Sequence, residues 1–223
     1  MNTVFQQYYE KSIRIAPDGF SFYKHDGKLL IGKFFPRSSD ALLSTEAPAF
    51  FGSDDTITVI AAHYIPMLVP NEIHDPEKNS AYLQLQFDTS QLGATFADVT
   101  GQYSSVYFLT KNENDTIGRL PFRCEVVAET TLLYRFLTEN TTEPSIFMAL
   151  NRDFVDILAV QKGEIAFLNR FPLVEPSDIL CYIYNIMKQF NLRQPELYLH
   201  FFAEEDKKLV QLLKQYSFKT NIL

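Results

Sequence analysis

Two segments of this chain, 136 residues apart, repeat the same succession of strand and turn signals. The first, residues 12–35, contains short β-favouring runs separated by the turn sequences PDG and DG. The second, residues 146–171, has similar runs separated by NRD and KG, and aligning Gly27 with Gly163 superposes GKLLIGKFF on GEIAFLNRF. Short β-branched and aromatic runs between turn residues predict two three-stranded antiparallel meanders. Their common order indicates an internal duplication.

Each meander is followed by signals for further helices and strands, which are clearer in the second half. There, residues 179–190 carry an apolar stripe at helical spacing, residues 197–202 predict a strand, and residues 204–216 predict an amphipathic helix. In the first half, the corresponding helix at residues 40–51 is interrupted by a proline, and residues 56–62 supply the fourth strand. The second half therefore predicts the order β-β-β-α-β-α, which is that of a ribonuclease-H-like unit, and the first half is an eroded but recognisable version of it.

The residues between these halves give weaker signals. Alternation of polar and apolar side chains predicts strands at Tyr82–Phe87 and Val106–Leu109, and residues 121–139 predict a helix with proline at its start. Residues 111–118 and 138–143 are polar and predict loops, the second of which is the expected hinge.

This pattern predicts an N-terminal lobe with a small insertion, residues 1–140, and a C-terminal lobe, residues 141–223. The hydrophobic fraction of 46% and the charged fraction of 21% are typical of a globular protein. A net charge of -7 without any run of Lys or Arg argues against nucleic acid as a partner. The N-terminal sequence lacks the pattern of a signal peptide, and no stretch of 18 apolar residues occurs, so we expect a cytoplasmic protein with no membrane insertion.

Three sequence features together resemble one known family. They are the opening GFSFYKHDGKLLIGKFF, the segment Tyr64–Pro70 with Glu72 following, and the segment Ala166–Phe171 leading into Asp178–Tyr182. They resemble the DUF3822 family of uncharacterised Bacteroidetes proteins, which belongs to the actin-like ATPase superfamily. The similarity extends over nearly the whole chain. It implies an α/β protein with the actin-like ATPase fold, in which two lobes are built from duplicated ribonuclease-H-like units.

In members of that superfamily that bind ATP, the first turn of each meander resembles D-x-G-[ST], because glycine lets backbone N–H groups approach phosphate. Here Gly19 at the glycine position places Pro17 where the acidic residue is expected, and Asp18 is out of register. The resemblance thus gives Asp18, Gly19, Ser21 and Asp153 as vestigial phosphate-loop positions. The alternative is that Asp18-Gly19 is only a hairpin turn and that Asp153 is a turn or cap residue.

The other two loops depart further from the superfamily pattern. The second turn, NRDF, contains no glycine, and FFAEE stands where a glycine pair would contact adenosine. The carboxylates of this third segment would lie close to anionic phosphates. We therefore expect no cofactor.

No other catalytic or metal-binding pattern is present. The four histidines lack the spacing of a metal site, so no metal is expected, and no nucleophile has a base in a readable pattern. Cys124 and Cys181 do not form a C-x-x-C pair and are expected to be buried reduced thiols. No catalytic residue is predicted.

Three functions remain compatible with the sequence. The first is a non-catalytic protein-interaction platform, in which the aromatic and proline-containing stretch Tyr64–Pro70 contacts a protein partner. In that stretch, Ile65, Leu68 and Val69 could equally be buried between the lobes. The second is a residual ATP-binding switch with relocated contacts. The third is a small-molecule enzyme that uses a cleft between lobes.

Overall fold

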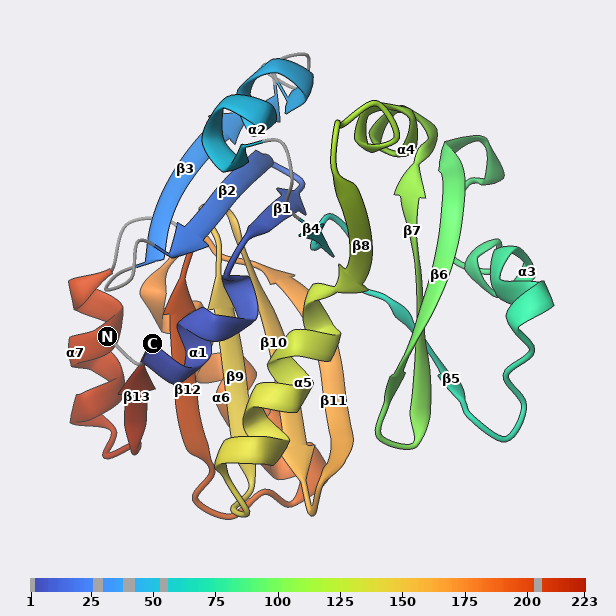
Figure 1. Cartoon of the computed structure of the whole chain (residues 1–223). Helices are drawn as coiled ribbons and strands as arrows, with labels where there is room; N and C mark the ends of the chain where they lie inside the picture. The colour runs from blue at the N-terminus through green and yellow to red at the C-terminus, as the bar shows by residue number, and fades with distance from the viewer. Residues whose placement is uncertain (1–2, 26–29, 38–42, 53–55, 203–205) are drawn as a thin grey trace. The chain divides into compact units, whose positions relative to one another are not determined.

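The computed structural model describes residues 3–25, 30–37, 43–52, 56–202 and 206–223. The chain divides into two compact units, each of which is described by itself (Figure 1). The N-terminal unit is Val4–Leu132, and the C-terminal unit is Leu133–Leu223 together with Met1–Thr3. The division falls within helix α5 (Glu129–Asn140).

The N-terminal unit is built on a five-stranded mixed sheet with the order β3-β2-β1-β4-β8. The strands of this unit are β1 (Ser12–Ala16), β2 (Gly19–His25), β3 (Leu30–Pro36), β4 (Thr56–Ala61), β5 (Met67–Pro70), β6 (Leu92–Thr100), β7 (Tyr103–Thr110) and β8 (Arg123–Ala128). The helical segments of this part of the chain are α1 (Thr3–Gln6), η1 (Gln7–Tyr9), α2 (Leu43–Phe51), η3 (Pro76–Lys78), α3 (Asn79–Leu83), η4 (Thr89–Gln91) and α4 (Lys111–Ile117). Strands β1 to β3 form the predicted antiparallel meander, and β4 and β8 join it in parallel to β1.

The C-terminal unit has a second five-stranded mixed sheet with the equivalent order β11-β10-β9-β12-β13. Its strands are β9 (Ser145–Leu150), β10 (Phe154–Gln161), β11 (Glu164–Pro172), β12 (Glu196–Phe201) and β13 (Thr220–Ile222), and its helices are α6 (Pro176–Phe190) and α7 (Lys207–Gln215). In each sheet the middle strand begins an antiparallel meander and pairs in parallel with the strand that follows a helix. This correspondence confirms the duplicated unit. The glycine-to-glycine alignment itself uses Gly27, which is outside the described residues.

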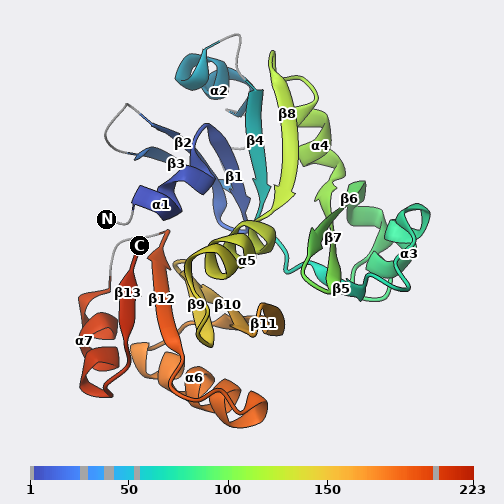
Figure 2. The same cartoon turned by 60° about the horizontal axis from the view of Figure 1, so that its bottom comes forward.

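Helices cover both faces of the C-terminal sheet (Figure 2). The apolar stripe of α6 and the buried leucines of α7 pack on one face, in a core with inward residues of β9, β10 and β12. On the other face, Phe136 of α5 contacts the rings of Phe147 and Tyr198 edge-on, at centroid distances of 5.9 and 5.5 Å. Because both faces are covered, all six residues of the central strand β9 are buried.

Between β4 and β8 the chain forms a separate three-stranded antiparallel sheet with the order β5-β7-β6. Val69, Leu83, Val106 and Phe108 form a small apolar core between this sheet and α3. Most of the predicted contact stretch Tyr64–Pro70 is therefore part of a folded insertion. Within it Val69 is buried, whereas Ile65 and Leu68 are half-buried.

Three sequence predictions for this region are wrong. Residues 82–87 are not a strand, because Leu83 and Phe87 are four residues apart and pack into the same core at the end of α3. Residues 111–117 are not a loop, because Thr110 and Glu113 form a reciprocal capping box that starts α4. Residues 121–139 are not one helix, since β8 pairs with β4 before α5 begins.

The predicted loop at 138–143 is also shortened, because α5 continues to Asn140. No helix among the described residues has both the length and the apolar character that a bilayer crossing requires.

A charged pair is buried in the N-terminal unit beneath the central strand. Arg14 of β1 donates two hydrogen bonds to the Glu129 carboxylate at the start of α5, at 2.6 and 3.0 Å, and Tyr9 donates a third at 3.0 Å. Both charged side chains are about 95% or more buried. Burial alone would lower the pKa of Arg14, but the neighbouring Glu129 carboxylate reverses this effect and raises it. The Arg14 guanidinium therefore keeps its positive charge inside the fold.

We predict that Glu129→Leu lowers the free energy of unfolding by about 3–5 kcal/mol, because it leaves the Arg14 guanidinium buried without its anion. The double variant Arg14→Met/Glu129→Leu should regain much of this loss, because no unpaired charge remains. Glu46→Leu, which removes the exposed partner of Lys33, is the control and should cost about 1 kcal/mol or less. Urea unfolding monitored by circular dichroism measures all three. Equal costs for Glu129→Leu and Glu46→Leu would show that burial of the pair is not important.

Candidate functional site

The first candidate turn joins β1 to β2 at the carboxyl end of β1. It consists of Pro17 and Asp18, and Pro17 has no N–H group to offer a ligand. Gly19 follows with a φ of +152°, and a Cβ atom on Gly19 would lie 2.0 Å from the backbone oxygen of Phe35. The glycine is therefore required for the close approach of β2 to the end of β3.

Arg37, immediately after β3, binds the backbone of this turn. Its Nη2 donates to the carbonyl oxygen of Ala16 at 2.6 Å, and its Nε donates to the carbonyl oxygen of Pro17 at 2.8 Å. The backbone N–H of Arg37 donates to the carbonyl oxygen of Asp18 at 2.8 Å. Three consecutive carbonyl groups are thus held by one residue. The Arg37 side chain occupies the carbonyl side of the turn.

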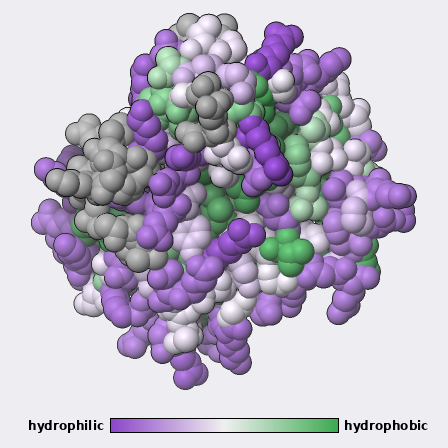
Figure 3. Space-filling model, in the orientation of Figure 1, coloured by the Kyte–Doolittle hydropathy of each residue, from purple (hydrophilic) through white to green (hydrophobic). Residues whose placement is uncertain are grey.

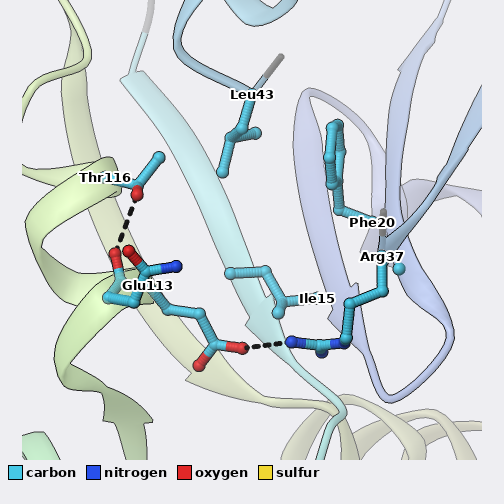
Figure 4. Close-up of a pocket in the computed structure, with 8 residues that line it drawn as sticks. Ile15, Phe20, Arg37, Leu43, Glu113 and Thr116 are labelled. Carbon is cyan, nitrogen blue, oxygen red and sulfur yellow. Dashed lines mark hydrogen bonds and ion pairs between the residues drawn. The ribbon is translucent and has the colours of Figure 1, made fainter. Parts of the chain in front are cut away.

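Arg37 also reaches towards a buried carboxylate on α4 (Figure 4). Its Nη1 lies 3.6 Å from Oε1 of Glu113, whose other oxygen, Oε2, accepts the backbone N–H of Thr110 at 2.9 Å. The Nε2 atom of His63 lies 3.5 Å from the same Oε2, and both the His63 and Glu113 side chains are more than 90% buried. His63 follows β4, so this cluster lies at the carboxyl ends of parallel strands, where α/β folds commonly place ligands.

The residues predicted from the resemblance are only partly brought together. Asp18, Gly19 and Ser21 share one hairpin, whereas Asp153 belongs to the C-terminal unit. The Oδ1 atom of Asp18 is buried and accepts no hydrogen bond from the described residues, so it is not exposed for a hydrated metal ion. Ser21 is buried within β2, where it pairs with Arg14 of β1.

The second candidate turn joins β9 to β10 in the C-terminal unit. The N–H of Asn151 donates to the carbonyl of Phe154 at 2.9 Å, and the carbonyl of Asp153 accepts the N–H of Leu173 at 3.0 Å. Asp153 is exposed, and the turn has no glycine and no positive φ. One hydrogen bond therefore closes the turn on itself, and the other joins it to the residue that follows β11.

An open pocket, of about 750 Å³ including the space open to solvent, lies beside this second turn and is lined by Asn151, Arg152, Phe201 and Asp206 among others. Asp206 is the N-cap of α7, and its Oδ1 accepts the N–H groups of Lys208 and Leu209 at 2.9 and 3.2 Å. A helix N-terminus can bind an anion through such N–H groups, but here a carboxylate of the chain already binds them. Ala203–Glu205, part of the third predicted loop, are outside the described residues.

The described residues do not fit magnesium-ATP in the manner of the superfamily. The first turn lacks one N–H group and is held by Arg37, the second is closed on itself, and the amides of α7 are capped by a carboxylate. The part of the chain that the structure describes also contains no group of three or more His, Cys, Asp or Glu residues placed to hold a metal ion.

Sequence reasoning missed Arg37, His63 and Glu113 as members of a cluster. They come from three separate segments of the chain, so no local spacing relates them. One signal was present, because Thr110 and Glu113 have the T-x-x-E spacing of a capping box, which predicts the helix that carries Glu113.

The cysteines are free thiols, as predicted, but neither of them is buried. Cys124 is half-buried and Cys181 is exposed on α6. Burial raises the pKa of the Cys124 thiol to about 11, so it is mainly protonated at neutral pH.

Comparison with known proteins places this chain in a family and a fold. The model of the family described as "Protein of unknown function (DUF3822)" matches residues 51–219. No curated protein matches the chain.

The solved structures that are similar to it include the following two. One is a Bacteroides thetaiotaomicron protein with actin-like ATPase fold and unknown function, with a TM-score of 0.71, 17% identity, and coverage of 100% of this chain and 93% of that chain. The other is a chain of the PilM-PilN type IV pilus biogenesis complex, with a TM-score of 0.57, 9% identity, and coverage of 96% of this chain and 88% of that chain. At these identities the likeness shows the fold alone, and it confirms the predicted actin-like ATPase fold.

We predict that Gly19→Ala lowers the free energy of unfolding by about 2–5 kcal/mol, because the added Cβ meets backbone atoms that cannot rotate away. Gly163→Ala is the matched control. Gly163 has a φ of +79° but nothing within 4 Å of an added Cβ, so only the backbone strain of about 1–2 kcal/mol is expected. Urea unfolding midpoints compare the two variants. A Gly19→Ala cost no larger than that of Gly163→Ala would contradict a packing role for Gly19.

Proposed function

The chain belongs to the DUF3822 family and has the actin-like ATPase fold, and from this premise we propose that it is a non-catalytic, intracellular platform for a protein partner. In this proposal the two-unit fold is retained while nucleotide chemistry is lost. The observation that carries the proposal is that the β1–β2 turn contains a proline and that Arg37 binds its carbonyl groups.

That turn offers a phosphate group little to bind. Phosphate recognition by a turn requires several backbone N–H groups pointing outward at a site that tolerates negative charge. Here Pro17 contributes none, and Arg37 is bound to the turn's carbonyl groups and lies next to Glu113. In the other unit, the Asp206 carboxylate caps α7. Both arrangements support the absence of a nucleotide role.

Two observations support a role in protein binding. The fold occurs in a protein complex, since a chain of the PilM-PilN type IV pilus biogenesis complex is similar in structure. In addition, hydrophilic residues predominate on the face drawn in Figure 3, so exposed aromatic rings elsewhere in the chain are candidates for a contact surface. Tyr184 and Tyr216 are 46% and 51% exposed.

These tyrosines belong to one aromatic cluster of the C-terminal unit. The ring of Tyr184 on α6 lies 6.4 Å from that of Tyr216 and 5.7 Å from that of Phe218, between centroids. Together with Met187 and Lys219 they line an open depression of about 1000 Å³, a volume that includes the space open to solvent. Tyrosine is enriched in the centres of protein interfaces, because it buries a large ring and keeps a polar hydroxyl. We propose this cluster as the main contact, with the half-buried residues of Tyr64–Pro70 as a second.

We predict that millimolar magnesium-ATP leaves the melting temperature unchanged. A ligand at 100 times its dissociation constant would stabilise the protein by about 2.7 kcal/mol, which corresponds to a rise of roughly 5–10 °C for a chain of this size. An actin-like ATPase that binds nucleotide serves as the positive control, and magnesium alone as the negative control. A reproducible rise of that size, or phosphate release that Asp18→Ala abolishes, would favour the alternative of an ATP-binding switch.

We predict that a partner protein co-purifies with the tagged chain from its own host and is lost with Tyr184→Ser/Tyr216→Ser. Removing two central aromatic side chains should reduce recovery at least tenfold. The control is Ile73→Ser/Leu85→Ser, which removes two apolar side chains that are 67% and 81% exposed in the insertion. Quantitative mass spectrometry of the eluates measures the ratio. Equal recovery with the tyrosine variant and wild type would remove this surface from the proposal.

A further inference from the structure

The aromatic depression proposed above as the main contact lies at the opposite end of the C-terminal sheet from the turn at Asp153. Its lining includes Glu143, Glu196 and Lys219, which stand where the parallel strands β9, β12 and β13 begin. Ligands of α/β folds commonly bind at the carboxyl ends of such strands, where the turn at Asp153 lies. The depression is therefore separate from the phosphate-loop positions, and its own side chains indicate what it binds.

The aromatic wall of the depression is fixed by the way α7 ends. Ser217 follows the C-cap residue Tyr216 with a φ of +58°. The N–H of Phe218, the next residue, donates to the carbonyl of Leu213 at 3.4 Å, as in the Schellman motif that closes many helices. This turn of the chain places the Phe218 ring beside Tyr184 of α6. The carboxyl end of α7, where the helix dipole favours positive charge, thus lies at the depression.

The rings of Tyr184 and Tyr216 are available to a partner. Each side chain is about half exposed. Within the part of the chain that the structure describes, neither hydroxyl has a hydrogen-bond partner, and no Lys or Arg lies over either ring. The face of an aromatic ring carries negative charge and attracts a cation. The two rings can therefore receive a cation from another molecule.

The charged residues of the lining also favour a cation. Glu196 and Lys219 form an ion pair with each other. Glu143 is exposed and forms no ion pair with any described residue. Lys188 and Lys214 belong to α6 and α7 but do not line the depression. The lining therefore keeps one unbalanced negative charge, which repels an anion and attracts a cation.

We propose that this depression receives an arginine side chain of the protein partner, an inference that rests on the proposed function. The guanidinium stacks on the exposed tyrosine rings and forms an ion pair with Glu143. Arginine fits better than lysine, because its planar group stacks on rings and donates to a carboxylate through a fork of N–H groups. The net charge of -7 also favours a basic partner, since charge complementarity speeds association.

The test uses three capped tripeptides that differ only in the middle side chain, which is arginine, citrulline or norleucine. Citrulline has the shape of arginine without its charge, and norleucine is apolar. Titration into the whole isotope-labelled protein, followed by backbone amide shifts at Tyr184, Tyr216, Ser217 and Lys219, gives the dissociation constants. For the arginine peptide we expect a value on the order of millimolar. The citrulline peptide should bind about tenfold more weakly.

Two variants separate the contribution of the carboxylate from that of the rings. Glu143→Gln removes the anion, so the preference for arginine over citrulline should fall to about threefold or less. Tyr184→Leu/Tyr216→Leu keeps apolar surface but removes the aromatic faces, so arginine binding should fall about fivefold and norleucine binding should stay within about twofold. The control is Glu72→Gln, an exposed site in the other unit with the same charge change, which should alter neither value.

Three outcomes overturn the inference. They are equal affinity of wild type for the arginine and citrulline peptides, an arginine preference that Glu143→Gln leaves intact, and the absence of saturable shifts up to the solubility limit of the arginine peptide. The comparison of peptides uses the wild-type chain, so it remains decisive if a variant folds poorly.

The inference and the proposed function fail in distinguishable ways, because the peptides do not require the host's partner protein. If Tyr184→Ser/Tyr216→Ser loses the partner but the peptides show no arginine preference, the platform stands and the arginine contact is wrong. If the arginine preference is found but no partner co-purifies from the host, the depression binds guanidinium groups and the platform is wrong.

Discussion

The N-terminal unit depends on the ion pair between Arg14 and Glu129. Strand β1 lies at the centre of its sheet with all five residues buried, so a guanidinium there has no access to water and must be paired within the protein. The carboxylate that pairs with it is 115 residues away, in the first turn of α5. Because Tyr9 donates to the same carboxylate, the pair joins the N-terminal segment, the central strand and the start of α5. An unpaired charge at any of these places would favour unfolding.

A second carboxylate extends this arrangement to the insertion. Asp98 of β6 accepts the N–H of Ala128, the hydroxyl of Thr131 and the hydroxyl of Tyr107, at 2.9, 3.0 and 3.1 Å. Two anionic side chains, Asp98 and Glu129, thus stand at the N-terminus of α5, where the helix dipole favours negative charge. The insertion contributes the acceptor that begins the helix. This explains why β8 ends at Ala128 although the sequence pattern continues as a helix across it.

The parts of the fold that the sequence predicted are those with local determinants. The turn residues between short strands set both meanders, and the spacing of Ile179, Ile183 and Ile186 defines α6. The wrong assignments fall in the insertion, where residues 82–87 and 121–128 take their structure from strand pairing and core contacts with distant segments. The candidate cluster shows the same division. A family pattern could point to Asp18 and Gly19, whereas only the fold brings Arg37, His63 and Glu113 together.

The β1–β2 turn and the β9–β10 turn occupy equivalent places in the two units, but their backbone groups form different hydrogen bonds. At the β1–β2 turn, the side chain of Arg37 binds the carbonyl groups of the turn. Gly19 allows the backbone of β2 to contact the backbone of Phe35. At the β9–β10 turn, the N–H of Asn151 donates to the carbonyl of Phe154, and the carbonyl of Asp153 accepts the N–H of Leu173. In both cases backbone groups of the turn form hydrogen bonds that stabilise their own unit. A residue with a backbone N–H in place of Pro17 would add one donor to the turn, while Arg37 would still hold its carbonyl side. The two equivalent turns are thus fixed by different contacts, each within its own unit, and not by a shared loop sequence.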